Sequence, residues 1–420
     1  MSKQKSYTTL KERGLIAQEG GGTLDEILSQ PRKVYLGVDP SADSLHVGNL
    51  VPILVLKHLY DLGHEPYLLV GGATGMIGDP RESGERQLLD TEVLTKNTRA
   101  IKKQLSTILK KDSLKVFNNA DWLAKLSLLD FLRDTGKHFS VNQLIKRDII
   151  KRRLETEEDS ISYTEFSYSL LQGYDYLHLF KKHSIDLQVG GSDQWANIIS
   201  GVDLIRRKTG ASTYALTTPI VTDKVTGKKF GKSEGNAIWL DPKKTSPFIF
   251  YQFWINVSDE NVEEYLKIFT FLNLKDISKL MAKHLRSPQN RLAQKTLAKE
   301  ITTFIHGLET TSSVEKVSEI LFGSGSLPTL TDGEKKMLVS EVPSQRLKSI
   351  TLKKGISLVE ILVSLNLATS KSDARQLISS GAIRINGTPI TTIDTILTEQ
   401  YLKDNLIFIK RGKKVALLFI

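Results

Sequence analysis

Cysteine is missing from all 420 residues of the chain, which excludes disulfide bonds, zinc sites built on thiolates and catalysis by a thiol. Its absence fits a reducing compartment, so we expect a cytoplasmic protein. The sequence also lacks a run of about 18 apolar residues, the length that a membrane-spanning helix requires. The first residues are polar and have no apolar core of a signal peptide. Together these absences predict a protein without a membrane partner.

The excess of basic side chains is unevenly distributed. The formal net charge is +11, from 58 Lys and Arg against 47 Asp and Glu. Residues 346–420 hold 12 of the basic and 5 of the acidic side chains, a balance of +7. A basic segment on a less charged body is typical of proteins that bind nucleic acids, although solubility alone also explains a positive balance.

Short apolar runs alternate with helical patterns in the first half of the chain. Residues 33–39 (KVYLGVD) and 66–71 (PYLLVG) have the pattern of buried parallel strands, and residues 48–63 between them have helical spacing. The same order recurs at residues 186–223, where DLQVGG and YALTTPIVTD are the strands. This alternation predicts an α/β fold with a Rossmann-like, doubly wound parallel sheet.

The chain divides into four predicted parts. The α/β domain covers residues 1–246 and carries a mostly helical insertion at about 92–182. Residues 247–322 have long helical patterns, which predict an α-helical domain. Residues 323–352 begin with a stretch rich in Gly, Ser, Thr and Pro and are interpreted as a linker. Residues 353–420 contain two short helical patterns and then strands, which predicts a small α+β domain.

The segment Leu-His-Val-Gly-Asn follows the first predicted strand at residues 45–49. Ligands of open α/β sheets lie beyond the carboxyl ends of the strands, and a helix N-terminus at this point favours phosphate. His46 and Asn49 are one helical turn apart and face one side, while Gly48 leaves the backbone open to a ligand. Alone, such a motif is more often a structural histidine beside a packing glycine.

A second motif, Lys-Phe-Gly-Lys-Ser, occupies residues 229–233. Lys229 and Lys232 are flexible point charges on either side of a glycine that permits the backbone to bend. Such a loop can neutralise the charge that develops on a transferred phosphate. Alone, the motif is more often a solvated basic loop.

The stretch YTEFSYSLLQGYDY at residues 163–176 places three polar side chains on one helical face, since Tyr168, Gln172 and Asp175 are spaced by four and three residues. Burying these groups without partners is costly, so the face belongs either to a binding site or to a polar surface.

Two further loops follow predicted strands. Asp79 closes the glycine-rich turn VGGATGMIGDP, and the loop GGSDQW carries Asp193 and Gln194 at the start of a helix. Asp193, an acid at the start of a helix, could bind a ribose, and such a residue is also typical of a helix N-cap. Arg81 and Arg86 are weaker candidates for contact with pyrophosphate.

The histidine motif at residues 45–49, followed far along the chain by the lysine motif at residues 229–233, resembles a pair of signatures of the class I aminoacyl-tRNA synthetases. These are the HIGH and KMSKS signatures, here in the variants HVGN and KFGKS. The stretch from Tyr35 to Asn49 and the helix at 163–176 are similar to the tyrosyl branch of that family. The resemblance covers nearly the whole chain. It implies an ATP-dependent ligase that forms tyrosyl-adenylate and pyrophosphate from L-tyrosine, then transfers tyrosyl to the 3′-terminal ribose of tRNA(Tyr).

The resemblance also implies roles for individual residues. Those expected to stabilise the transition state are His46, Asn49, Lys229, Lys232 and Ser233. Those expected to bind ATP are Gly37, Asp39, Ser41, His46, Gly48, Asn49, Asp193 and Lys232. Those expected to bind tyrosine are Tyr35 and Asp175 at its phenol, Asp79, Tyr168 and Gln172 at its ammonium group, and Gln194 at its carboxylate or at the α-phosphate. Asn49 stands where the signature has His, so its contact is expected to differ.

The pairing of Asp175 with a phenol implies selectivity, because phenylalanine leaves a buried carboxylate without its partner. Tyrosyl-tRNA synthetase is itself the standard example of this discrimination.

The last part of the chain resembles a small RNA-binding module first known from a ribosomal protein. The basic residues at the positions where that module meets RNA are Lys353, Lys354, Lys371, Arg375 and Arg384. Their expected role is contact with phosphates. By the same resemblance, the helical region 247–322 is expected to contact tRNA.

The expected partners are L-tyrosine, ATP carried as its Mg²⁺ complex, tRNA(Tyr) and a second copy of the chain, with no tightly bound metal in the protein. Two alternatives remain open at this point. One is a tryptophanyl-tRNA synthetase, which shares the fold. The other is an RNA-binding protein whose synthetase body is catalytically silent.

Overall fold

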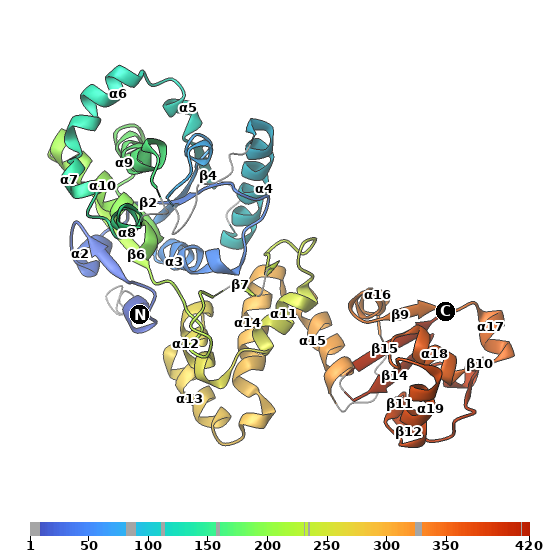
Figure 1. Ribbon diagram of the computed structural model, residues 1–420. Coiled ribbons are helices and arrows are strands. Elements are labelled where there is room, and N and C mark those ends of the chain that lie inside the picture. The colour runs from blue at the N-terminus through green and yellow to red at the C-terminus, as the bar shows by residue number, and fades with distance from the viewer. Residues whose placement is uncertain are drawn as a thin grey trace. The chain divides into compact units, whose positions relative to one another are not determined.

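The computed structural model describes residues 9–80, 90–110, 114–156, 160–230, 232–233, 236–323, 330–412 and 414–420. The chain forms two compact units (Figure 1). The first unit consists of Met1–Ser246 with Phe253–Ile301, and the second of Pro247–Gln252 with Thr302–Ile420. None of the helices among the described residues is long and apolar enough to cross a membrane.

The first unit is built on a twisted sheet that confirms the doubly wound α/β prediction. In the described chain this sheet has six strands in the order β1-β6-β5-β2-β3-β4. All neighbours run parallel except β1, which is antiparallel to β6 at the edge. The strands are β1 (Gln18–Gly20), β2 (Lys33–Val38), β3 (Glu65–Val70), β4 (Lys115–Asn118), β5 (Leu187–Gly191) and β6 (Tyr214–Thr218). The order reverses between β2 and β5, which creates the crevice where such sheets bind ligands.

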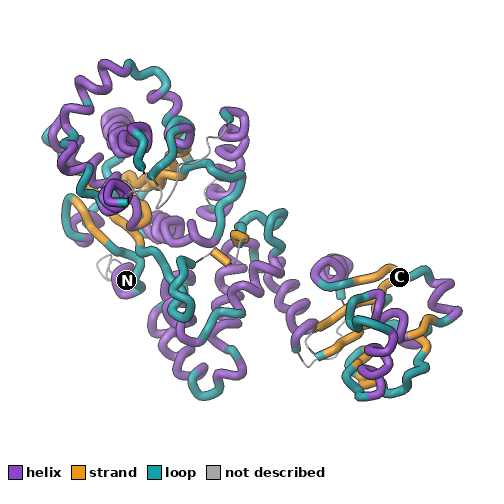
Figure 2. Tube along the Cα trace, viewed as in Figure 1, coloured by secondary structure: helices purple, strands orange, loops and turns teal. Residues whose placement is uncertain are grey.

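Helices cover both faces of this sheet, as Figure 2 shows. Tyr35 of β2 packs with Tyr67 of β3 and with apolar side chains of α9 (Tyr163–His183) and α10 (Trp195–Thr209). Because strand side chains alternate, Val34 and Leu36 point to the opposite face, where α3 (Leu50–Asp61) packs against β2, β3, β5 and β6. Burial on both faces explains the uninterrupted apolar character of the strands.

Most of the remaining helices of the segment between β3 and β5 form an arc beside the sheet (Figure 1): α5 (Ala120–Leu123), α6 (Leu128–Asp134), α7 (Val141–Leu144) and α8 (Asp148–Glu155). The helix α4 (Thr91–Leu109) lies apart from this arc. The segment predicted as a mostly helical insertion also supplies β4, which pairs with β3. The strand is only four residues long, and because Lys115 and Asn118 at its two ends are polar, its apolar pattern is too short to be recognised from the sequence.

A buried ion pair joins α8 to the start of α9. Arg153 donates through Nη1 to Glu165 at 2.7 Å, and both side chains are almost completely buried. Glu165 also accepts from the backbone N–H of Ser162, whose side chain in turn caps the helix. Removing one partner of such a pair costs about 3–5 kcal/mol because the other charge stays buried. The pair therefore ties α8 to the first turn of α9, whose start is marked by the capping box between Ser162 and Glu165.

The helices that follow the sheet are α11 (Pro247–Ile255), α12 (Asp259–Phe269), α13 (Leu274–His284), α14 (Leu292–His306) and α15 (Leu308–Phe322). The division between the two units passes through α11 and α14.

The second unit contains a sheet with the strand order β12-β11-β14-β15-β9. These strands are β9 (Ser344–Arg346), β11 (Ile383–Ile385), β12 (Thr388–Ile390), β14 (Leu406–Arg411) and β15 (Lys414–Phe419), and a separate pair joins β10 (Ile356–Ser357) to β13 (Ile396–Leu397). The predicted helix pair is present as α18 (Leu358–Ser364) and α19 (Lys371–Ser379), and both helices pack into the apolar core of this unit.

The stretch interpreted as a linker differs from the prediction, since it contains α16 (Asp332–Glu341), β9 and α17 (Ser349–Lys354). β9 runs parallel to β15 and so belongs to the sheet. Its three residues, Ser-Gln-Arg, have no apolar alternation, whereas the capping box between Thr331 and Glu334 is a signal that the sequence did offer for α16.

Candidate functional site

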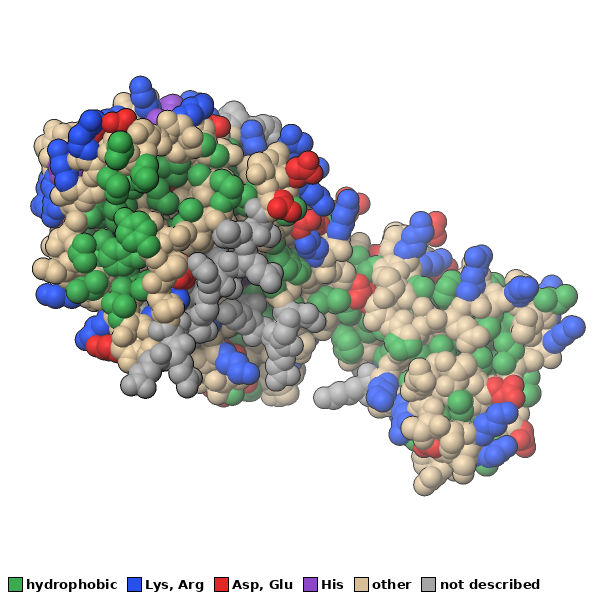
Figure 3. Space-filling view, turned by 45° about the horizontal axis from the view of Figure 1, so that its top comes forward, with side chains coloured by type: hydrophobic (Ala, Val, Ile, Leu, Met, Phe, Trp, Pro, Cys, Tyr) green, Lys and Arg blue, Asp and Glu red, His purple; other side chains and the backbone are tan. Residues whose placement is uncertain are grey.

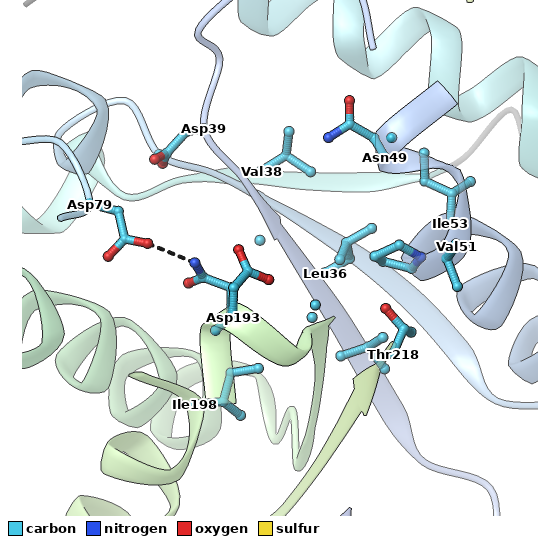
Figure 4. Close-up of a pocket in the computed structure, with 18 of the residues that line it drawn as sticks. Leu36, Val38, Asp39, Asn49, Val51, Ile53, Asp79, Asp193, Ile198 and Thr218 are labelled. Carbon is cyan, nitrogen blue, oxygen red and sulfur yellow. Dashed lines mark hydrogen bonds between the residues drawn. The ribbon is translucent and has the colours of Figure 1, made fainter. Parts of the chain in front are cut away.

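A cavity of about 450 Å³ opens at the carboxyl ends of the central strands of the first unit. Figure 4 shows the carboxylates of Asp39, Asp79 and Asp193 and the amide of Asn49 around it. The structure brings together at this cavity every predicted ATP, tyrosine and catalytic residue whose side chain it describes. These residues are Tyr35, Gly37, Asp39, Ser41, His46, Gly48, Asn49, Asp79, Tyr168, Gln172, Asp175, Asp193, Gln194 and Lys229.

His46 forms the N-cap of a short 3₁₀ turn, η1 (Val47–Asn49), that leads into α3. Its Nδ1 accepts a hydrogen bond from the Gly48 N–H at 3.1 Å, and the Asn49 side chain accepts from the His46 N–H at 3.1 Å. Because Nδ1 accepts, the proton of the neutral ring lies on Nε2, where the ring can donate to a phosphate oxygen. A Cβ at residue 48 would lie 2.8–2.9 Å from the His46 ring, so glycine here makes room for the histidine.

Backbone pairing brings the two distant motifs together. The Val47 N–H donates to the Ile238 carbonyl at 2.9 Å, and the Leu240 N–H donates to the Leu45 carbonyl at 2.8 Å. The segment that follows the lysine motif is thus an antiparallel neighbour of the histidine motif. A ligand that contacts His46 therefore also lies close to the segment that follows the lysine motif.

Phe230 anchors the lysine motif on its other side. Its ring centroid lies 4.9–5.3 Å from those of four aromatic residues on α11 and α12: Phe253, Trp254, Tyr265 and Phe269. Lys229, one residue earlier, is exposed at the cavity. The backbone of Lys232 and Ser233 forms β7 (Lys232–Ser233), which pairs with β8 (Asn236–Ala237), while their side chains lie outside the description.

The most buried acid of the cavity is Asp175, whose side chain is 1% exposed. Burial raises its pKa to about 7, although hydrogen bonds from Asn119 and Trp122 oppose the rise. Asn119 Nδ2 donates to one carboxylate oxygen at 2.9 Å and Trp122 Nε1 to the other at 2.7 Å. These donors orient the carboxylate and leave lone pairs of both oxygens for a further donor.

Tyr35, on β2, presents a buried hydroxyl to the same cavity. This hydroxyl has no hydrogen-bond partner among the described residues. Burial raises its pKa well above the ordinary value, with smaller contributions from Tyr176 and Asp175, so the group stays protonated. A buried hydroxyl without a partner is costly, and a polar ligand group removes that cost.

Asp79 is held between two amides. Gln194 Nε2 donates to its Oδ2 at 2.7 Å, the bond drawn in Figure 4, and Asn197 Nδ2 donates to its Oδ1 at 3.1 Å. Nearby, the Tyr168 hydroxyl donates to Asp39 Oδ2 at 3.2 Å. This end of the cavity offers two acidic side chains and a tyrosine, a set that suits an ammonium group.

Three residues of this arrangement were missed by the sequence analysis: Asn119, Trp122 and Asn197. Asn119 directly follows β4, and a polar residue after a strand would have been a usable signal if that strand had been recognised in the sequence. Nothing in the sequence pattern indicates that Trp122 would turn its N–H toward Asp175.

The predicted RNA contacts lie in the second unit and are all exposed. Lys353 and Lys354 are in the last turn of α17, Lys371 and Arg375 are on α19, and Arg384 is on β11. Lys371 pairs with Glu360 at 3.0 Å, an exposed ion pair. Their role in RNA binding stays a prediction.

Among the described residues, no cluster of three or more His, Asp or Glu side chains has an arrangement that could hold a metal ion. Arg81 and Arg86 lie outside the described residues.

Comparison with known proteins identifies two family models along the chain. Residues 28–323 match the model described as "tRNA synthetases class I (W and Y)". Residues 334–419 match the model described as "Tyrosine--tRNA ligase SYY-like C-terminal domain".

The chain is 45% identical to a tyrosine–tRNA ligase of Streptococcus mutans over 419 residues, which is 97% of this chain and 98% of the relative. It is also 45% identical to tyrosine–tRNA ligase 1 of Photorhabdus laumondii over 422 residues, 99% of this chain and 98% of the relative.

Among solved structures, a C-terminally truncated mitochondrial tyrosyl-tRNA synthetase of Aspergillus nidulans is similar, with a TM-score of 0.65 and 34% identity over 76% of this chain and 94% of that one. A tryptophanyl-tRNA synthetase of Encephalitozoon cuniculi shares the fold, with a TM-score of 0.54 and 16% identity over 74% of this chain and 90% of that one.

The hydrogen bond from Trp122 predicts a pH effect. A phenol donates best to an ionised Asp175, whose pKa is about 7, so affinity for L-tyrosine is expected to rise as pH rises through that value. Trp122→Phe removes a donor that lowers this pKa, so the midpoint is expected to move to higher pH. The midpoint is measured by determining the affinity for L-tyrosine at a series of pH values between about pH 6 and pH 8. Asp175→Asn is the control and should show no midpoint, and an unmoved or lowered midpoint in Trp122→Phe contradicts the assignment.

Proposed function

Because the chain belongs to the class I tRNA synthetases of the tryptophanyl and tyrosyl group, we propose that its cavity activates L-tyrosine with ATP and that the protein charges tRNA(Tyr). The identity to tyrosine–tRNA ligases over nearly the full length favours this function over the tryptophanyl and the silent RNA-binding alternatives.

The observation that carries the choice of amino acid is the pair formed by Tyr35 and Asp175. The substrate phenol donates a hydrogen bond to the Asp175 carboxylate, and its oxygen accepts one from the Tyr35 hydroxyl, which has no partner among the described residues. Phenylalanine satisfies neither group. At the other end, the substrate ammonium group meets Asp79, Tyr168 and Gln172.

The chemistry needs orientation and charge stabilisation, and no covalent bond to the protein. The tyrosine carboxylate attacks the α-phosphorus of ATP, a new P–O bond forms, and the bond to the departing pyrophosphate breaks. His46 donates from Nε2 to the phosphates, and Lys229 and Lys232 neutralise the charge that develops on them. Mg²⁺ enters with ATP and shields the same charge. In the second step the terminal ribose hydroxyl of tRNA attacks the tyrosyl carbonyl and AMP leaves.

Two regions are proposed to contact tRNA. One is the helical segment 247–322. The other is the basic end of the chain, where the exposed Lys353, Lys354, Lys371, Arg375 and Arg384 offer positive charge to phosphates.

We also propose that two copies of the chain associate through the helices α6 to α9. Figure 3 shows hydrophobic side chains gathered on the surface of the first unit. On these helices the apolar side chains of Leu128, Leu129, Val141 and Leu154 and the ring of Tyr163 are all more than half exposed, with Leu129 at 77% and Tyr163 at 71%. An apolar surface of this kind is typical of a protein–protein interface.

Exchange of labelled pyrophosphate into ATP tests the function directly. The purified protein with Mg²⁺ is expected to exchange label when L-tyrosine is present, and far more slowly with L-phenylalanine or L-tryptophan, because only tyrosine satisfies both phenol partners. Exchange that depends on tryptophan instead would overturn the choice of amino acid. Folded protein that exchanges with none of the three would leave only the RNA-binding alternative.

The proposed interface is tested by Leu129→Asp combined with Tyr163→Asp. Placing two carboxylates in an apolar contact is expected to convert a dimer into a monomer, as measured by sedimentation velocity at micromolar concentration. Leu308→Asp is a matched control, because Leu308 is also a highly exposed leucine but lies in the second unit. A wild-type monomer, or a double variant that remains dimeric, would contradict the interface.

A further inference from the structure

Arg147 lies outside the cavity lining yet is connected to it. It immediately precedes α8, is half-buried, and extends its guanidinium to α10. Nη1 donates to Asn197 Oδ1 at 3.2 Å, and Nη2 donates to the hydroxyl of Ser200. Burial lowers the pKa of Arg147 to about 10, partly opposed by the charge of Asp79, so the side chain is a cation at neutral pH.

From Arg147 the hydrogen bonds continue to the cavity. Asn197 Nδ2 donates to Asp79 Oδ1 at 3.1 Å and to Gln194 Oε1 at 3.3 Å. Gln194 Nε2 then donates to Asp79 Oδ2 at 2.7 Å. Each amide thus accepts on its oxygen and turns its N–H groups toward the carboxylate.

The direction of this relay follows from the chemistry of arginine. A guanidinium has donors and no acceptor, so it can bind only the oxygen of the Asn197 amide. With that oxygen engaged, Asn197 must present its N–H₂ to Asp79 and to the oxygen of Gln194. Without Arg147 the Asn197 oxygen loses its donor, so the amide is held by Asp79 and Gln194 alone and is free to turn away from this orientation.

We propose that Arg147 is a positioning residue for the ammonium group of the substrate: it fixes the amides of Asn197 and Gln194 and thereby the Asp79 carboxylate. This inference rests on the proposed function of the cavity. Two effects of the arginine oppose each other. Its positive charge repels the ammonium group, whereas its donor geometry orients the acid that binds it, and the partial exposure of Arg147 weakens the repulsion through solvent screening.

The test separates ammonium binding from phenol binding by choice of ligand. L-Tyrosine and tyramine both carry the ammonium group, and 3-(4-hydroxyphenyl)propionate keeps the phenol and lacks it. Arg147→Met removes every donor at similar volume. The affinity for tyrosine and tyramine is expected to fall by roughly tenfold, and that for the propionate by less than about twofold, as measured by calorimetry. Arg147→Lys restores a donor and is expected to recover most of the loss.

Arg206→Met is the matched control, because Arg206 lies on an exposed face of α10, the helix that carries Asn197, and pairs with Asp203. Equal losses for all three ligands would show a general structural role and overturn the proposal, as would unchanged or tighter tyrosine binding in Arg147→Met. If that variant does not fold, Asn197→Leu removes the amide that links Arg147 to Asp79 without adding a charge, and must give the same ligand pattern. Wild-type protein that binds no tyrosine would instead contradict the proposed function.

Discussion

The desolvation of one carboxylate, that of Asp175, constrains much of the first unit. A charge removed from water must be compensated, and here the compensation consists of N–H donors from Asn119 and Trp122. Asn119 occupies its position because β4 extends the sheet beyond β3, and Trp122 because α5 turns back toward α9. The Trp122 ring is held in turn by stacking on His178, with ring centroids 4.3 Å apart. The position of the Asp175 carboxylate, to which we assign the choice of substrate, thus depends on a strand and a helix outside the sequence motifs.

The hydrogen bonds from Asn119 and Trp122 compensate the desolvation of Asp175 only in part, which leaves the site able to bind a further donor. The pKa of Asp175 stays near 7, and the Tyr35 hydroxyl beside it has no partner among the described residues. A ligand with one atom that both donates and accepts a hydrogen bond would give a partner to the Asp175 carboxylate and to the Tyr35 hydroxyl. A phenol is such a ligand, and under the proposed function tyrosine satisfies both groups when it binds. Two other acids of the cavity are already hydrogen-bonded, Asp79 to two amides and Asp39 to Tyr168.

Much of this arrangement could be predicted from the sequence. The strands at 33–39 and 66–71 were recognisable because they are buried on both faces, and the polar face of Tyr168, Gln172 and Asp175 because its spacing is helical. Polar residues at the ends of these strands then had to meet, since parallel strands end on one edge.

The rest could not be predicted, for identifiable reasons. The strands β4 and β9 are too short and too polar to show alternation. The pairing of residues 45–47 with 238–240 and the seat of Phe230 among four aromatic rings are long-range contacts, which no local pattern encodes. The bond from Trp122 to Asp175 depends on side-chain orientation alone.

We propose that the Asp175 carboxylate is the group that distinguishes a phenol from a plain benzyl side chain. The ratio of kcat/KM for tyrosine to that for phenylalanine in pyrophosphate exchange, compared between the wild-type protein and Asp175→Ala, tests it most directly. Asp193→Ala serves as the control, because that acid is exposed at the cavity and is assigned to the ribose. We predict that the ratio falls by at least about tenfold in Asp175→Ala and stays close to the wild-type value in Asp193→Ala. An unchanged ratio in Asp175→Ala would contradict the account.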